Sequence, residues 1–130
     1  MIRNVTRLEN IMTAKTSTDV GTSLLISDYQ NVVISVASSG SASFTIKFQG
    51  SIADTCPDFS AAKSVTNPWE YIQVKDYQND ASINGSTGVT FSGDDCRLFE
   101  FNTNGLSWIN AVITSYSSGA VTVTCKAYHL

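Results

Sequence analysis

The chain has 130 residues, a formal net charge of −3, 42% hydrophobic residues and only 15% charged residues. This acidic balance excludes general binding to nucleic acids, because such binding needs Lys and Arg clustered against the phosphates. No stretch approaches the roughly 18 consecutive apolar residues of a membrane span, and no apolar signal core follows Met1, so we expect a soluble protein that is made in the cytosol and has no membrane contact.

The N-terminal stretch, residues 1–17, mixes charged residues, Asn and Thr with isolated apolar residues. The apolar positions recur at spacings of three and four, which weakly favours a short helix, but the intervening Thr and Asn support a helix poorly. We therefore interpret residues 1–17 as an N-terminal arm or first strand that precedes a β-domain over residues 18–130.

From Asp19 onward the pattern is that of β-strands. Residues 31–37 and 43–49 alternate apolar and polar side chains, and Ser38-Ser39-Gly40 is predicted to form a turn between them. The polar loop at residues 50–67 is long for a compact domain, which favours a role in contacts. Further strands are predicted at residues 21–26, 69–75, 81–83, 88–91 and 97–101.

The last quarter of the chain, residues 104–128, is predicted to form one long β-hairpin. Two runs rich in β-branched residues flank Ser117-Ser118-Gly119, which tolerates the positive φ of a hairpin turn. Strands spaced by roughly 8 to 12 residues, with Gly, Asn and Ser turns and no helical period, are typical of a sandwich. The predicted fold is therefore all-β, a jelly-roll-like antiparallel β-sandwich of eight or nine strands with an N-terminal arm.

The cysteines, Cys56, Cys96 and Cys125, are odd in number and have no CxxC spacing. This pattern indicates neither a zinc site nor a full disulfide framework, and a single disulfide would leave one thiol free. Because Cys96 and Cys125 lie in apolar strands, we expect both to be buried as small hydrophobic side chains.

The sequence offers little catalytic machinery. His129 is the single histidine and the penultimate residue, where a general base is poorly held beside a nucleophile. Asp76, Asp80 and Asp94-Asp95 are typical turn residues. The alternative interpretation is calcium binding by Asp76, Asn79 and Asp80, with Asp94 as a further ligand. We expect the protein not to be an enzyme and to use no cofactor or metal.

The aromatic residues are the better candidates for recognition. Trp108 is flanked by apolar residues and is predicted to anchor the core. Trp69 and Tyr71 follow the long polar loop, so we predict that they contact a partner, because aromatic residues are enriched at interfaces. The alternative is a sugar-stacking platform on one face of the sandwich, formed by Trp69, Tyr71, Trp108 and Tyr116.

Several segments carry a family resemblance. They are an amphipathic strand that ends in Gly-Ser (44–51), a Gly-Leu-Ser-Trp strand (105–110), a terminal Thr/Val strand (119–123), and the runs at 69–76 and 84–89. Together they resemble small β-sandwich virion structural proteins of tailed bacteriophages.

The resemblance implies a capsid decoration or auxiliary head protein that binds the assembled shell. Its partners would be the major capsid protein or other virion proteins, its location the virion, and its state a homo-oligomer. We expect an arm carrying Arg3, Arg7, Ile11 and Met12 to supply a strand or hook to the shell or to a neighbouring subunit. The alternative is a tail or head-fibre module that binds carbohydrate or a receptor through the long loop and the aromatic residues beside it.

Overall fold

The computed structural model describes residues 5–129, in which all nine secondary-structure elements are β-strands. They pair antiparallel in one continuous sheet of order β1-β9-β3-β8-β5-β6, with β2 paired to β9 and both β4 and β7 paired to β3. We find no membrane-spanning helix within residues 5–129. The strands are β1 Val5–Lys15, β2 Leu24–Leu25, β3 Asn31–Ser51, β4 Glu70–Tyr71, β5 Val74–Asp76, β6 Ala81–Ile83, β7 Val89–Ser92, β8 Cys96–Phe101 and β9 Trp108–His129.

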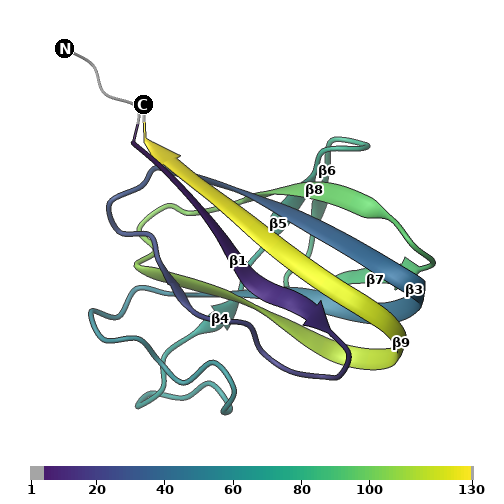
Figure 1. The fold of residues 1–130 in the computed structure, drawn as a ribbon. Helices are drawn as coiled ribbons and strands as arrows, with labels where there is room; N and C mark the ends of the chain where they lie inside the picture. Colours follow the sequence, from purple (N-terminus) through teal and green to yellow (C-terminus); the bar gives the residue numbers. More distant parts are fainter. Residues whose placement is uncertain (1–4, 130) are drawn as a thin grey trace.

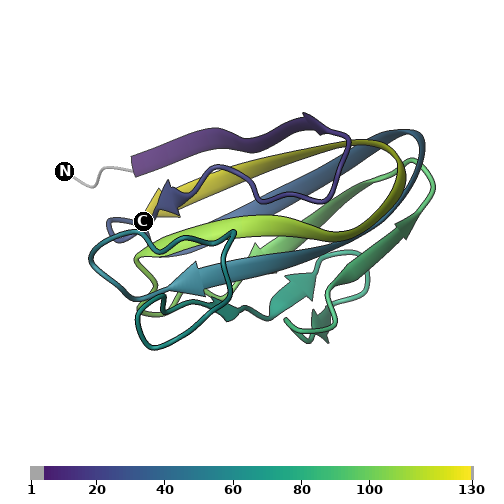
Figure 2. The same cartoon turned by 90° about the horizontal axis from the view of Figure 1, so that it is seen from below.

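The long strands β3 and β9 build both layers of the fold. They pair with each other from Asn31 and Tyr128 at one end to Ser51 and Trp108 at the other. Both curve sharply midway and pass from one layer to the other (Figures 1 and 2). The first half of β3 pairs with β8 and the second half with β7. The all-β, sandwich-like class is confirmed, whereas the single continuous sheet does not confirm a jelly roll.

The two Ser-Ser-Gly triplets mark this bend, and the turns predicted there were wrong. Ser38–Gly40 lies inside β3 and Ser117–Gly119 lies inside β9, so the predicted hairpin is one bent strand over Trp108–His129, and residues 104–107 precede it. Gly119 has a φ of 93°, and a Cβ at this position would lie 2.6 Å from the Cα of Ala42. A strand that switches layers needs the same permissive residues as a hairpin turn, which explains the error.

The core lies between the two layers and is built from alternate residues of the strands. The ring of Phe44 stacks on Phe91 with 4.7 Å between centroids, and Phe48 packs 5.8 Å from Phe99. Each such side chain contributes about 1.5–3 kcal/mol when it is buried. The largest side chains with almost no exposure are Phe48, Phe99, Met12, Ile26, Ile34, Ile46, Ile109 and Ile113.

Strand β1 brings most of the predicted arm into the sheet, where it pairs with β9. Ile11 and Met12 are only 3% and 1% exposed, so their side chains are not accessible to a partner as predicted. The physical reason is a register shift between Asn10 and Met12, which lets the neighbouring side chains of Ile11 and Met12 both point inward. The strand therefore lacks strict alternation, and its apolar residues have the spacing of a helix. Arg3 lies outside the described residues.

Single-residue predictions have mixed outcomes. Cys125 is buried as predicted, and burial raises the pKa of its thiol to about 12. Cys96 is exposed, so its predicted burial was wrong, although it is free like the other cysteines. Trp108 is half-buried and its indole N–H donates to the carbonyl oxygen of Asp54 at 3.4 Å, whereas the neighbouring Ile109 enters the core in its place.

Candidate functional site

The loop between β3 and β4, residues 52–69 and here named the β3–β4 loop, projects from one end of the molecule (Figure 1). The side chain of Phe59 is only 4% exposed, and its ring lies 6.2 Å from the ring of Trp69 at the base of the loop. The buried amide of Gln49 on β3 donates through Nε2 to the carbonyl oxygen of Phe59 at 2.9 Å. A buried hydrogen bond therefore attaches the loop to the sheet at its one buried apolar residue.

Asn67 is the hub that holds the β3–β4 loop together. Its Oδ1 accepts from the backbone N–H of Asp58 at 2.8 Å, and its Nδ2 donates to the carbonyl oxygens of Asp58 and Ala62. Ser64 and Asn67 also exchange backbone hydrogen bonds at 3.0 and 3.2 Å. Hydrogen bonds from the Ser60 hydroxyl and backbone N–H lower the pKa of Asp58. Such dense internal bonding gives a compact loop with one shape, as in an Ω-loop.

The predicted pair Trp69 and Tyr71 lies at the base of this loop. The ring of Trp69 meets Tyr71 edge-on, with centroids 5.0 Å apart and an interplanar angle of 81°. Its indole N–H donates to the carbonyl oxygen of Ala61 at 3.0 Å, and Lys47 Nζ lies 4.9 Å from the centroid of the Tyr71 ring. Two perpendicular rings do not present one flat surface on which a sugar could stack. The contacts of the pair with Ala61 and Lys47 indicate that it supports the base of the loop.

A mostly apolar groove of about 490 Å³ runs between the β3–β4 loop and the end of β3. Val65 and Ile52 beside it are 98% and 74% exposed. An ion pair of 2.5 Å between Lys63 and Glu70 borders the groove, and Lys63 together with the backbone N–H of Tyr71 lowers the pKa of the Glu70 carboxyl. Aliphatic side chains that a rigid loop holds in water are typical of a surface that contacts protein.

Sequence reasoning found the loop and its aromatic residues but missed Val65 and Ile52. The one sequence signal for an exposed apolar contact was the isolated Val65 in the polar run 63–67. The composition of this run as a whole is typical of a solvent-exposed loop. The predicted contact residue Arg7 lies on β1, outside this loop, and its Nε is 3.2 Å from Glu9 Oε1.

The carboxylates considered for catalysis or calcium are engaged separately. Asp76 is only 2% exposed and forms an ion pair with Arg97, while Asp80 pairs with Lys75 at 2.8 Å. Asp94 accepts a hydrogen bond from a backbone N–H at 3.0 Å. Within residues 5–129 no three His, Cys, Asp or Glu side chains come together, so the structure does not form the calcium arrangement considered from sequence.

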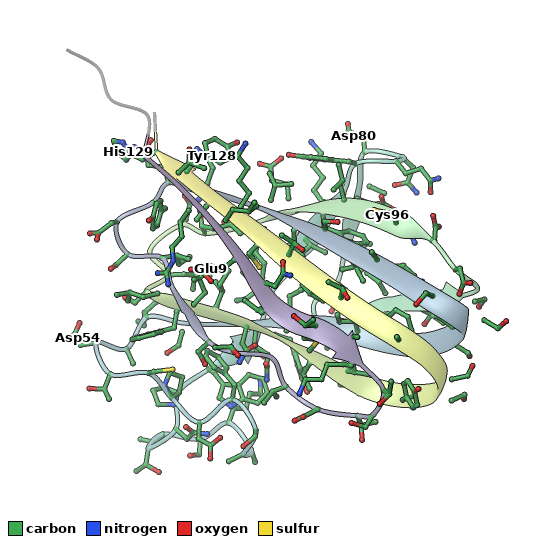
Figure 3. The ribbon with its side chains drawn as sticks, viewed as in Figure 1. Glu9, Asp54, Asp80, Cys96, Tyr128 and His129 are labelled. Carbon is green, nitrogen blue, oxygen red and sulfur yellow. The ribbon has the colours of Figure 1, made fainter. Side chains whose placement is uncertain are left out.

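A second apolar surface lies on the outer face of β1, β9, β3 and β8. A hollow of about 520 Å³ is bordered there by Leu8, Val33, Leu98, Tyr128 and His129. Leu8 is 67% exposed and Leu98 is 45% exposed. Figure 3 shows Tyr128 and His129 together at the end of β9. This surface reaches the outermost strand of the sheet, β1.

Comparison with known proteins finds likeness in structure and not in sequence. No family model and no curated protein matches the chain. The crystal structure of the SPBc2 prophage-derived protein YomS is similar, with a TM-score of 0.71 and 14% identity over 98% of this chain and 96% of that one. The PBSX exported protein XepA is similar with a TM-score of 0.73 and 17% identity, over 98% of this chain but only 39% of XepA. The likeness establishes a shared fold, and the chain spans well under half of XepA.

Proposed function

We propose that this chain is a structural protein of a bacteriophage particle, a decoration or auxiliary head protein that binds the assembled shell. The fold shared with YomS, a prophage-derived protein, over nearly the whole of both chains supports a phage origin. So does the likeness to XepA, a protein named for PBSX. Under this proposal the location is the virion, and the partner is the major capsid protein or another virion protein.

The β3–β4 loop is the observation that carries the proposal. Val65 is 98% exposed on a loop that Asn67, Gln49 and Phe59 already hold in place. Burying such an aliphatic side chain contributes about 1.5–3 kcal/mol. Binding would not have to order the loop, so little of this gain is lost. A protein that binds only the assembled shell stabilises the assembled state by mass action.

This surface replaces the arm as the proposed point of attachment. β1 pairs with β9, and Ile11 and Met12 are part of the core, so releasing residues 5–15 as a hook would open the sandwich. The loop and its groove need no such rearrangement, because their apolar side chains are exposed in the folded chain.

Co-sedimentation with empty shells of the phage whose genome carries this gene tests the proposal. The unchanged protein should pellet with the shells, and Val65→Asp and Ile52→Asp should stay in the supernatant. Leu25→Asp is the matched control, because Leu25 is an exposed aliphatic residue (39%) on β2 and outside the loop. Circular dichroism verifies that every variant is folded. Unchanged pelleting of Val65→Asp would refute the loop as the attachment site, and failure of the unchanged protein to bind any shell would refute the function.

A tail or head-fibre module that binds carbohydrate or a receptor is the second candidate. The half-buried ring of Trp69 beside an open groove favours it. A glycan array separates the two functions, because a decoration protein should give no signal. A signal that Trp69→Ala abolishes and Val65→Asp leaves intact would favour the second candidate.

A further inference from the structure

We propose that the free edge of β1 pairs with the same edge of a second copy of this chain, giving a two-fold symmetric dimer with Leu8 on the axis. The inference concerns a different surface from the β3–β4 loop and does not depend on the proposed function. Its elements are an unpaired strand edge, the order of charges along that edge and an exposed leucine at its centre.

The first element is the open edge itself. β1 is the terminal strand of the sheet and pairs with β9 on one side only. The carbonyl oxygen of Ile11 accepts a backbone hydrogen bond from Thr22 at 2.8 Å, so the chain that follows β1 covers the edge from Ile11 onward. Among the described residues, Thr6 to Asn10 remain uncovered. Figure 3 shows Glu9 beside β1, on the side away from β9. Such an edge presents backbone N–H and C=O groups that another strand can pair with.

The order of charges along this edge is self-complementary. Arg7 and Glu9 lie two residues apart on one face of β1 and are half exposed, with side-chain exposures of 41% and 46%. In an antiparallel pair, residues directly opposite each other place their side chains on the same face. When Leu8 faces Leu8 of the second copy, Arg7 faces Glu9 of the second copy, and the symmetry repeats this contact. Two opposite-charge pairs thus form across one axis.

The charges also select this register against its neighbours. Sliding the pair by two residues in one direction places Arg7 opposite Arg7 of the second copy, and the other direction places Glu9 opposite Glu9. Like charges directly opposite each other are destabilising. A slip by one residue places the face of one strand that carries Leu8 beside the face of the other strand that carries Arg7 and Glu9, so the apolar faces of the two copies no longer meet. Charged side chains on an edge strand commonly oppose pairing. On this edge the two charges have opposite signs, so the register with Leu8 at the axis turns them into favourable pairs.

Leu8 supplies the apolar contact at the axis. Its side chain is 67% exposed, and its register partner on β9 is Lys126, so it lies on the outer face beside the hollow described above. Across the axis it would meet Leu8 of the second copy, and the outer apolar faces of both copies would become continuous. An unrelated strand would cover the same backbone groups but would have no reason to match this charge order, so a second copy fits best.

A single cysteine at the axis tests the geometry. Leu8→Cys, in a background in which Cys56 and Cys96 are changed to Ser, should form a disulfide-linked dimer under mild oxidation. Residues opposite each other in an antiparallel pair have Cβ atoms about 4.5–5.5 Å apart, which a small shift brings to disulfide range. Thr6→Cys alone and Asn10→Cys alone should not cross-link, but a mixture of the two should give the mixed dimer. Cross-linking of Thr6→Cys alone, or none with Leu8→Cys, would overturn the proposed register.

Charge reversal tests the energetics by sedimentation velocity. Arg7→Glu and Glu9→Arg should each raise the dimer dissociation constant about tenfold, since each affects two charge pairs. The double variant should restore dimerisation, because it reverses every pair at once. Circular dichroism verifies that the single variants are folded. A protein that is monomeric at the highest soluble concentration overturns the proposal, and a dimer indifferent to both single variants places the interface elsewhere.

Discussion

Replacing Arg97 by Met tests the ion pair that closes one side of the sandwich. Arg97 on β8 reaches Asp76 on β5, and the two side chains are 20% and 2% exposed. The guanidinium also lies 5.8 Å from the centroid of the Phe91 ring and 5.4 Å from that of Phe99. It therefore joins the edge of one layer to an aromatic side chain of the other.

The expected cost follows from this geometry. Removing one partner of a buried pair costs about 3–5 kcal/mol, because an uncompensated charge stays behind. Asp76 keeps one hydrogen bond, from the backbone N–H of Gln78 at 2.9 Å, and Arg97 is partly exposed. Both facts favour the lower end of the range, and Met retains the apolar stem of Arg. We therefore expect Arg97→Met to lower the free energy of unfolding by about 3 kcal/mol.

Urea denaturation followed by circular dichroism measures this loss, provided the m-value is unchanged. The double variant Asp76→Leu/Arg97→Met is the matched comparison, because well-packed apolar residues replace buried ion pairs at little cost. We expect it to recover most of the lost stability. A loss below about 1 kcal/mol for Arg97→Met is what an exposed pair would give, and would refute the buried-pair reasoning.

Further predictions concern the glycine bend, the buried thiol, the loop anchor and β1. Gly119→Ala should lower the free energy of unfolding, measured in urea, by about 1–3 kcal/mol more than Gly105→Ala does. Both residues have positive φ, but only a Cβ at position 119 would clash. Equal losses for the two variants would contradict the corner geometry. Burial raises the pKa of the Cys125 thiol from 9.0 to about 12. The contribution of this thiol to the free energy of unfolding is therefore complete below pH 9 and falls by about 4 kcal/mol as pH rises to 12. The urea stability difference between the unchanged protein and Cys125→Ala should shrink over that range, and a constant difference would contradict the assignment. Phe59→Ala should increase hydrogen exchange of residues 53–68 and leave β9 protected, whereas uniform loss of protection would show that the loop is not a separate unit. Deleting residues 1–15 removes Ile11 and Met12 from the core and should cost about 4 kcal/mol or more, so a truncated protein of unchanged stability would restore the arm interpretation.

The short strands were predictable because their signals are local. The strand expected at residues 81–83 is β6 with the same bounds, and those expected at 88–91 and 97–101 are β7 and β8 within a residue at either end. β7 and β8 alternate between buried and exposed side chains, which is the pattern that a strand leaves in the sequence, whereas β6 has no buried residue. The Ser-Ser-Gly triplets could not be assigned in this way, because a corner and a hairpin turn require the same φ values and differ only in which distant strand lies opposite.

In the candidate site, too, the features with a local signal could be predicted from the sequence, and those that depend on distant partners could not. Trp69, Tyr71 and the polar loop were visible as composition, but the exposure of Val65 depends on hydrogen bonds that Asn67 makes across the loop. Asp76 was interpreted as a turn residue because its partner, Arg97, is 21 positions away. Only the register between β5 and β8 brings the two together. Non-local pairing of this kind is a property of the assembled sheet and leaves no trace in a sequence window.

The integration of β1 into the sheet constrains how the chain can bind its partners. Ile11 and Met12 cannot leave the core without exposing it, so under the proposed function attachment would have to use surfaces that are already formed. The β3–β4 loop and the edge from Thr6 to Asn10 are such surfaces, and they involve different strands. A dimer through β1 would carry two copies of the loop. On a shell with repeated sites, binding of one loop would raise the effective concentration of the other, so a modest affinity per loop gives firm attachment only when the spacing of the two loops matches the lattice. If both proposals hold, variants that abolish the dimer should weaken shell binding more than they weaken the contact of a single loop.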